Sequence, residues 1–144
     1  MEWHFRSADP AKALAERRAF AEFLRTRCTP ESDWQAAEIV YGELVANVVR
    51  HAPGPIEIML RTDARGAVRI EVCDTATHFT MATPVEPPLY AETGRGLHII
   101  WCLCGNLSRT KTLTGGKVIV VLPIVPLAPD SVDPPVSRVA PRHP

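Results

Sequence analysis

The sequence predicts an α+β fold, a two-layer sandwich in which about three helices cover one face of a mostly antiparallel sheet. Three observations support this prediction. The chain has 144 residues and is 46% hydrophobic, which is enough for one core. Short stretches of alternating polarity occur in pairs joined by polar turns, as in antiparallel strands. Longer stretches with apolar residues three and four positions apart predict the helices.

The first half of the chain carries clear start and stop signals. Asp9-Pro10 and Thr29-Pro30-Glu31 are typical of helix N-termini, and Pro53-Gly54-Pro55 ends a helix. The polar turn Asp63–Gly66 separates two strands. The predicted elements are a strand at 3–6, helices at 11–27 and 31–50, and strands at 56–60 and 68–72.

The second half begins with residues 75–93, which contain three prolines and show no period, so a long loop is predicted there. A helix then starts at Gly96 and ends at Gly105, with Trp101 in the core. Residues 107–113 and 117–122 are predicted to form a hairpin about Thr114-Gly115-Gly116.

Residues 1–122 are therefore expected to form one domain. Residues 123–144 hold half of the chain's 14 prolines and few large apolar residues. This proline-rich tail is expected to be extended or disordered and to lie outside the core.

The overall charge excludes some partners. The formal net charge is zero, so nothing global attracts nucleic acid or an anionic membrane. The sequence lacks a long apolar run and a hydrophobic signal segment, so a cytoplasmic protein is expected. The four cysteines are then expected to be reduced packing residues, because Cys102-Leu103-Cys104 does not have the spacing of a zinc site.

The most informative motif lies in the helix predicted at 31–50 and its end. Glu43, Asn47 and His51 follow one another at intervals of four residues, which places them close to one helical face. Polar groups on a largely apolar helix cost desolvation energy unless a ligand needs them. Carboxylate and amide oxygens suit magnesium, which keeps waters and shares substrate phosphates.

The order of these features resembles a known family. A helix with Glu43-x-x-x-Asn47, a strand ending in Asp74, a long loop and Gly94-Arg95-Gly96 opening a helix resemble the Bergerat ATP-binding fold. Gyrase, the heat-shock chaperone of that type, histidine kinases and MutL share this fold. The chain is most similar to the short anti-sigma-factor serine-protein kinases of bacterial partner switching, and the resemblance covers Trp3 to Leu122.

The resemblance implies a role for each matching residue. Glu43 would be the general base, and Asn47 would bind the Mg²⁺ that bridges the ATP phosphates. Asp74 would accept a hydrogen bond from the adenine amino group, which selects adenine over guanine. The remaining nucleotide-binding positions that it implies are Arg50 and His51 beside the phosphates, Ala76 in the first glycine box, and Thr93, Gly94, Arg95, Gly96 and Leu97 at the second glycine box.

The resemblance also implies partners. The protein would bind a sigma factor or another regulated target in one state. In the other state it would bind and phosphorylate a serine of a small STAS-type anti-sigma-factor antagonist. Homodimerisation through the surface opposite the nucleotide is expected, without direct contact to nucleic acid or membrane.

Three departures from the family pattern bear on activity. The first glycine box reads Asp74-Thr75-Ala76-Thr77-His78 and lacks both glycines, which changes the adenine pocket. Glu92 stands where the family kinases often have a basic residue. Gly116-Lys117 replaces the family's glycine and threonine beside the adenine aspartate.

Other interpretations remain open from the residues alone. Glu43 can form an ion pair with Arg50 or with another helix, Asn47 can be a satisfied buried amide, and His51 can interact with the helix dipole. Asp74 can start a turn, and Gly94 and Gly96 can form an ordinary turn. For the whole chain, the alternatives are an inert protein-binding module and an ATPase domain that serves a separate histidine phosphoacceptor. A complete histidine kinase is not expected, because the chain lacks room for a dimerisation helix pair.

Overall fold

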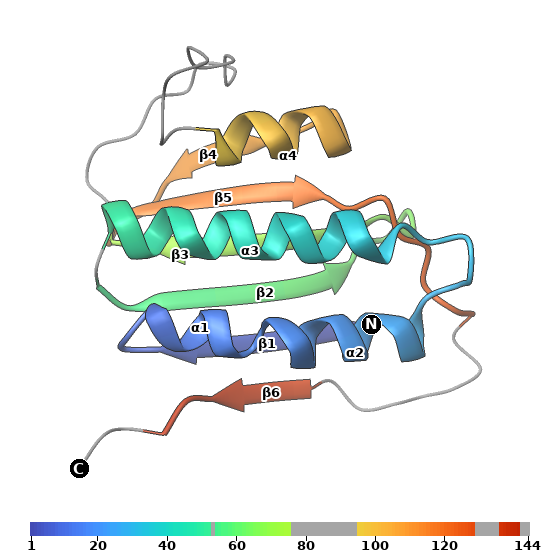
Figure 1. Cartoon of the computed structure of the whole chain (residues 1–144), viewed down its shortest axis with the longest axis horizontal. Coiled ribbons are helices and arrows are strands. Elements are labelled where there is room, and N and C mark those ends of the chain that lie inside the picture. Colours follow the sequence, from blue (N-terminus) through green and yellow to red (C-terminus); the bar gives the residue numbers. More distant parts are fainter. Residues whose placement is uncertain (53, 76–94, 129–135, 142–144) are drawn as a thin grey trace.

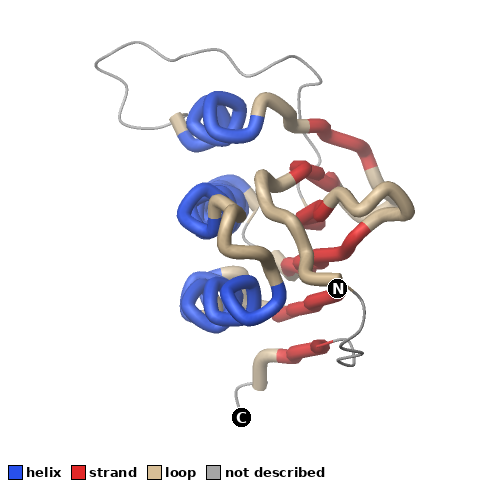
Figure 2. The backbone as a smooth tube through the Cα atoms, turned by 90° about the vertical axis from the view of Figure 1, so that its right-hand side faces the viewer, coloured by secondary structure: helices blue, strands red, loops and turns tan. Residues whose placement is uncertain are grey.

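The computed structural model describes residues 1–52, 54–75, 95–128 and 136–141. The helices cover one face of a six-stranded sheet with the order β4-β5-β3-β2-β1-β6 (Figures 1 and 2). Among these strands only β1 and β6 pair in parallel, so the predicted α+β sandwich is confirmed. In chain order the elements are β1 (Glu2–Ser7), α1 (Ala11–Ala15), α2 (Arg17–Arg27), α3 (Trp34–His51), β2 (Ile56–Thr62), β3 (Val68–Asp74), α4 (Gly96–Cys104), β4 (Ser108–Lys111), β5 (Gly116–Val121) and β6 (Val136–Val139).

An aromatic cluster joins the helices to the sheet. The ring of Phe20 lies 5.3 Å from Trp3 and 4.6 Å from Tyr41, measured between centroids. The buried Tyr41 hydroxyl donates a 2.7 Å hydrogen bond to the carbonyl of Ala13, which satisfies its polar group inside the core. Burial raises the pKa of Tyr41 above its usual range. This cluster holds α1, α2 and α3 against β1.

The helix predicted at 11–27 is interrupted. Glu16 separates α1 from α2, and its N–H donates to Ala13 O at 3.2 Å in a tight turn. Its carboxylate lies 2.9 Å from the Arg138 guanidinium of β6. The described residues therefore form four helices and not three, because a contact with a distant strand fixes a break that local sequence does not signal.

The turns follow their sequence signals. The Asp63 carboxylate accepts from the N–H groups of Arg65 and Ala67 at 2.9 and 3.0 Å, and Gly66 adopts φ 85°. These hydrogen bonds, led by that of Arg65, hold the pKa of Asp63 below its usual value. Gly105 ends α4 in the left-handed region with φ 68°, as predicted. Most of the loop predicted at 75–93 lies outside the described residues.

The segment after residue 122 was expected to lie outside the core, but part of it is buried in the core. Ile124 is only 5% exposed and belongs to the hydrophobic core. The Ser32 hydroxyl accepts a 2.8 Å hydrogen bond from the N–H of Val125. β6 is extended and pairs with β1, so it covers an edge that would otherwise offer free backbone groups. The domain boundary at residue 122 stays a prediction.

Several helices and strands have their ends at the same end of the molecule. The C-terminus of α3, the N-terminus of α4 and the adjoining ends of β3, β4 and β5 lie at the left of Figure 1. This arrangement brings the residues of the predicted site to the same end. Within the described ranges, no helix is long and apolar enough to cross a membrane.

We predict that Ile124→Ala lowers the free energy of unfolding by about 2–4 kcal/mol, because it leaves a cavity in the core. Val125→Ala is the matched control, since Val125 is 55% exposed. The control should change stability by no more than about 0.5 kcal/mol. Chemical denaturation measures both. Equal, small losses in the two variants would show that the segment does not pack on the core.

Candidate nucleotide-binding site

Helix α3 carries the central motif. Its N-terminus is capped by the Asp33 carboxylate, which accepts from the N–H of Ala36 at 3.0 Å. Its buried face, which includes Val40, Leu44 and Val48, packs on the core. Glu43 and Asn47 are half-buried at the border of this face, whereas Arg50 and His51 are exposed near the end of the helix.

The carboxylate of Glu43 lies directly against the start of α4. A Cβ atom added to Gly96 would stand 2.5 Å from Glu43 Oε2. Only glycine leaves room for this approach without a shift of the carboxylate. The structure therefore brings together two residues that are far apart in the sequence and that were both predicted to belong to the site.

Glu43 and Asn47 make no side-chain hydrogen bond or ion pair with any residue that the structure describes. The alternative ion pair between Glu43 and Arg50 is not formed among these residues. The Arg50 Nε donates instead to Ala46 O at 3.3 Å in its own helix. The alternative that the Asn47 amide is satisfied by protein partners also finds no support among the described residues, because its side chain makes no hydrogen bond to them. The two half-buried side chains therefore keep hydrogen-bonding capacity that water or a ligand can use.

The N-terminus of α4 faces the same region. Arg95 precedes Gly96 at the N-cap without a side-chain capping bond, and α4 runs for nine residues. N–H groups in the first turn of a helix lack intrahelical acceptors and favour anions. Leu97 is half-buried and packs against the core. Thr93 and Gly94 of the predicted glycine box lie outside the described residues.

Asp74 ends β3 on the helix-facing side of the sheet. It pairs directly with Gly116 of β5. A Cβ atom on Gly115 would collide with the Asp74 carbonyl and with the backbone of Thr75, so the hairpin packs closely on the end of β3. A Cβ on Gly54 would likewise stand 2.5 Å from the Thr75 hydroxyl. The predicted position Ala76 lies outside the described residues.

The register corrects one expectation from the sequence. Lys117 does not stand beside Asp74, because it pairs with Cys73 and faces the other side of the sheet. Its ammonium group lies 3.7 Å from the carboxylate of Glu71, which also contacts Arg61 at 3.2 Å. The residue next to Asp74 on the helix-facing side is Gly116, which has no side chain.

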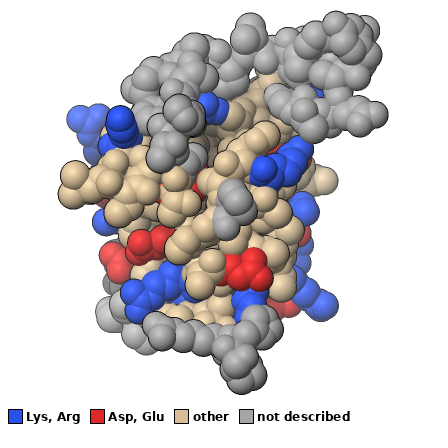
Figure 3. Space-filling model, turned by 90° about the vertical axis from the view of Figure 1, so that its left-hand side faces the viewer, with Lys and Arg blue, Asp and Glu red and all other residues tan. Residues whose placement is uncertain are grey.

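Sequence reasoning missed two basic residues at this end. Arg109 and Lys111 of β4 pair with Val118 and Gly116 and so share the helix-facing side with Asp74. Burial lowers the pKa of Arg109 below its usual value, and the negative charge of Asp74 opposes this shift. The spacing of the two residues was visible in the sequence, but their register relative to Asp74 was not. Figure 3 shows Lys and Arg side chains gathered on both sides of the upper half of this end.

The cysteines differ from one another. All four are free thiols, as expected. Burial raises the pKa of Cys28 to about 11 and also raises the pKa values of Cys73 and Cys104. Cys102 is exposed, with its sulfur 3.4 Å from His98 Nε2, so the expectation that all four are packing residues is wrong for Cys102.

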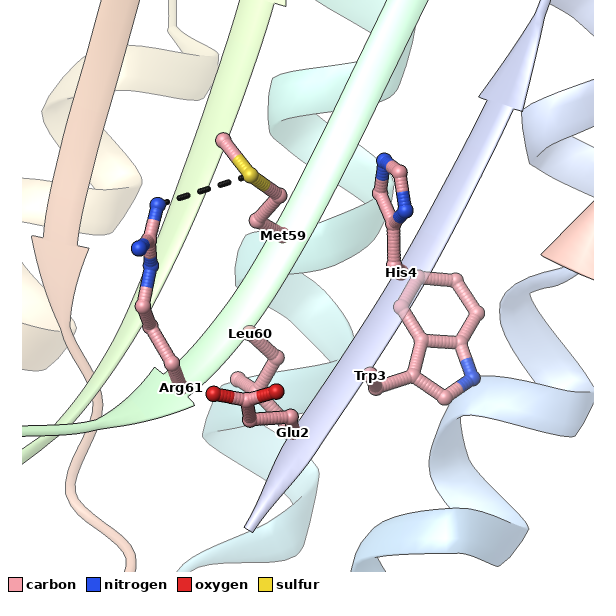
Figure 4. Close-up of a pocket in the computed structure, with 6 residues that line it drawn as sticks. All are labelled: Glu2, Trp3, His4, Met59, Leu60 and Arg61. Carbon is pink, nitrogen blue, oxygen red and sulfur yellow. Dashed lines mark hydrogen bonds between the residues drawn. The ribbon is translucent and has the colours of Figure 1, made fainter. Parts of the chain in front are cut away.

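Two hollows formed by described residues lie elsewhere. One of about 170 Å³ lies over β1 and β2, where His4, Met59 and Arg61 line it (Figure 4). The other, of about 360 Å³, is lined by residues that include Trp101 and Leu107. Trp101 was predicted in the core but is only half-buried at this hollow. Neither hollow includes Glu43, Asn47 or Asp74.

The sequence matches a known protein family. The family model of the histidine kinase-like ATPase domain matches residues 6–122. The chain belongs to this family. Among solved structures it is similar to the mycobacterial sensor histidine kinase MprB, with 14% identity, a TM-score of 0.48, and coverage of 83% of this chain and 98% of that chain. No curated protein matches the sequence.

Membership of the histidine kinase-like ATPase family implies that the domain binds ATP, usually with Mg²⁺. The donor set fits that ion. Within the described residues, no cluster of three or more His, Cys, Asp or Glu side chains exists that would hold a metal by itself. Asn47 would offer one amide oxygen, and Mg²⁺ accepts such an incomplete protein shell because it usually keeps waters and shares substrate phosphates.

We predict that Glu43 and Gly96 are energetically coupled. Gly96→Ala forces the Glu43 carboxylate to move in the native protein but has no such effect once Glu43→Ala has removed it. A double-mutant cycle of thermal or denaturant unfolding should therefore give an interaction energy of at least about 0.5 kcal/mol. Strictly additive effects would contradict the contact between the two helices.

Proposed function

We propose that this ATPase-family domain is a serine-protein kinase that binds Mg-ATP and phosphorylates a small antagonist protein, as anti-sigma-factor kinases do in a partner switch. The observation that carries the proposal is the position of the Glu43 carboxylate. It lies at the N-terminus of α4, half-buried and without a hydrogen-bond partner among the described residues.

The triphosphate would lie between α3 and α4. The first-turn N–H groups of α4 favour phosphate oxygens, and Gly96 lets the backbone come close to them. Asn47 lies one helical turn beyond Glu43 and would hold Mg²⁺ against the same phosphates. Arg95 and Arg50 supply positive charge near the transferred group. Bound ATP supplies the phosphoryl group, and Mg²⁺ neutralises its charge.

The adenine base of ATP would lie at Asp74. The hairpin residues next to Asp74 are glycines and so place no side chain beside this carboxylate; these residues are Gly115 and Gly116. A carboxylate acceptor matches the 6-amino group of adenine. The missing glycines of the first glycine box and the acidic Glu92 favour slow turnover, which suits a regulatory kinase.

The nature of Glu43 favours a hydroxyl as the phosphoryl acceptor. A serine hydroxyl is neutral at physiological pH and gains from a general base. Glu43 takes the proton from the serine oxygen as that oxygen bonds to the γ-phosphorus, the bond to the β-phosphate oxygen breaks, and ADP leaves. A neutral imidazole already has a free lone pair and needs no such base.

The partners follow from the same resemblance. A small STAS-type antagonist would present the serine, and a sigma factor or another target would bind in the alternative state. A homodimer formed through the surface opposite the nucleotide is part of this proposal. An ATPase domain that serves a histidine phosphorelay is the competing function, and the family match is equally compatible with it.

We predict that Glu43→Gln abolishes phosphorylation of a cognate antagonist while Mg-ATP still binds, because only the base is lost. Asn47→Ala should lose both activities, because the ion and the phosphates lose their ligand. Transfer from γ-labelled ATP and calorimetric binding of Mg-ATP measure the two effects. Arg18→Gln is the control, since Arg18 is an exposed residue of α2.

Two results would contradict the proposal. Near wild-type transfer by Glu43→Gln would show that Glu43 is not the base. A labelled partner that loses its phosphate in acid would identify phosphohistidine and favour the phosphorelay, whereas phosphoserine survives this treatment.

A further inference from the structure

The helix-facing side of the sheet has an ordered row of residues at the candidate site. Lys111 of β4, Gly116 of β5 and Asp74 of β3 are directly paired neighbours. In the next row, Arg109 pairs with Val118, and Val118 pairs with Val72. Directly paired residues of antiparallel strands point to the same side, so Arg109 and Asp74 share one surface.

Gly116 lies on the strand between these two residues and has no side chain, although its backbone is buried. Asp74 and β4 are separated by two strand spacings, or about 10 Å. Glycine at position 116 places no side chain in that interval. An arginine on β4 is long enough to extend toward Asp74 across such a position.

The charges agree with this geometry. The Arg109 guanidinium is partly buried and interacts electrostatically with Asp74. The competing cation Lys117 is on the other side of the sheet, next to Glu71. A donor group from β4 and an acceptor group from β3 therefore lie on the surface where the base is expected.

We propose that Arg109 is a second base-recognition residue, which donates a hydrogen bond to a ring nitrogen of adenine while Asp74 accepts from the 6-amino group. This inference rests on the proposed binding of ATP. The 6-amino donor of adenine is flanked by the ring acceptors N1 and N7. A neighbouring acceptor and donor on the protein match this edge, and arginine is a common donor to purine acceptors.

The test is calorimetric binding of Mg-ATP, Mg-1-deaza-ATP and Mg-7-deaza-ATP, because each analogue lacks one ring acceptor and keeps the 6-amino group. The wild-type protein should bind one of the two analogues about tenfold or more weakly than ATP, as expected for a lost hydrogen bond to a charged group. The analogue that binds more weakly shows whether Arg109 donates to N1 or to N7 of adenine. Arg109→Met should bind ATP and that analogue equally.

Arg69→Met is the matched control, because Arg69 lies on the strand of Asp74 but faces the other side, where it pairs with Asp63 at 3.1 Å. It should keep the wild-type discrimination. Equal wild-type binding of all three nucleotides would overturn the inference without any variant, so a failure of Arg109→Met to fold does not remove the test. Undiminished discrimination in folded Arg109→Met would also overturn it. No binding of ATP by the wild-type protein would instead refute the proposed function itself.

Discussion

The contact between Glu43 and Gly96 fixes how closely the two helices that frame the candidate site approach each other. A larger residue at position 96 would displace the carboxylate that the proposed chemistry needs. The same glycine keeps the backbone of the α4 N-terminus accessible, where N–H groups favour phosphate. One close approach therefore places the Glu43 carboxylate next to the N-terminus of α4, and Asn47 follows one turn later in α3.

The sheet supplies the other half of the site through its strand order. β5 lies between β3 and β4, so that Asp74 and the basic residues of β4 belong to one surface although 33 residues lie between Asp74 and Ser108 in the sequence. Gly116 stands between them without a side chain. The core beneath this surface is apolar, with Ile70, Val72 and Val120 fully or almost fully buried.

Local signals allowed most of the fold to be predicted. The turn at Asp63–Gly66, the end of α4 at Gly105 and the polar face of α3 depend on residues close in sequence. The break at Glu16 and the burial of Ile124 were missed, because each depends on a partner more than 90 residues away. The residues of the site were predicted through a resemblance, whereas Arg109 required the strand register. A one-residue difference in register also separates Gly116, beside Asp74, from Lys117 on the other face.

Nucleotide titration followed by amide NMR tests the central claim most directly. With Mg²⁺ and a non-hydrolysable ATP analogue at millimolar concentration, the account predicts that the largest shift changes occur at the end of α3, at Asp74 and at the first turn of α4. The hollow lined by Trp101 and Leu107 should show little change. Changes centred on that hollow, or no changes at all, would contradict a nucleotide site between α3 and α4.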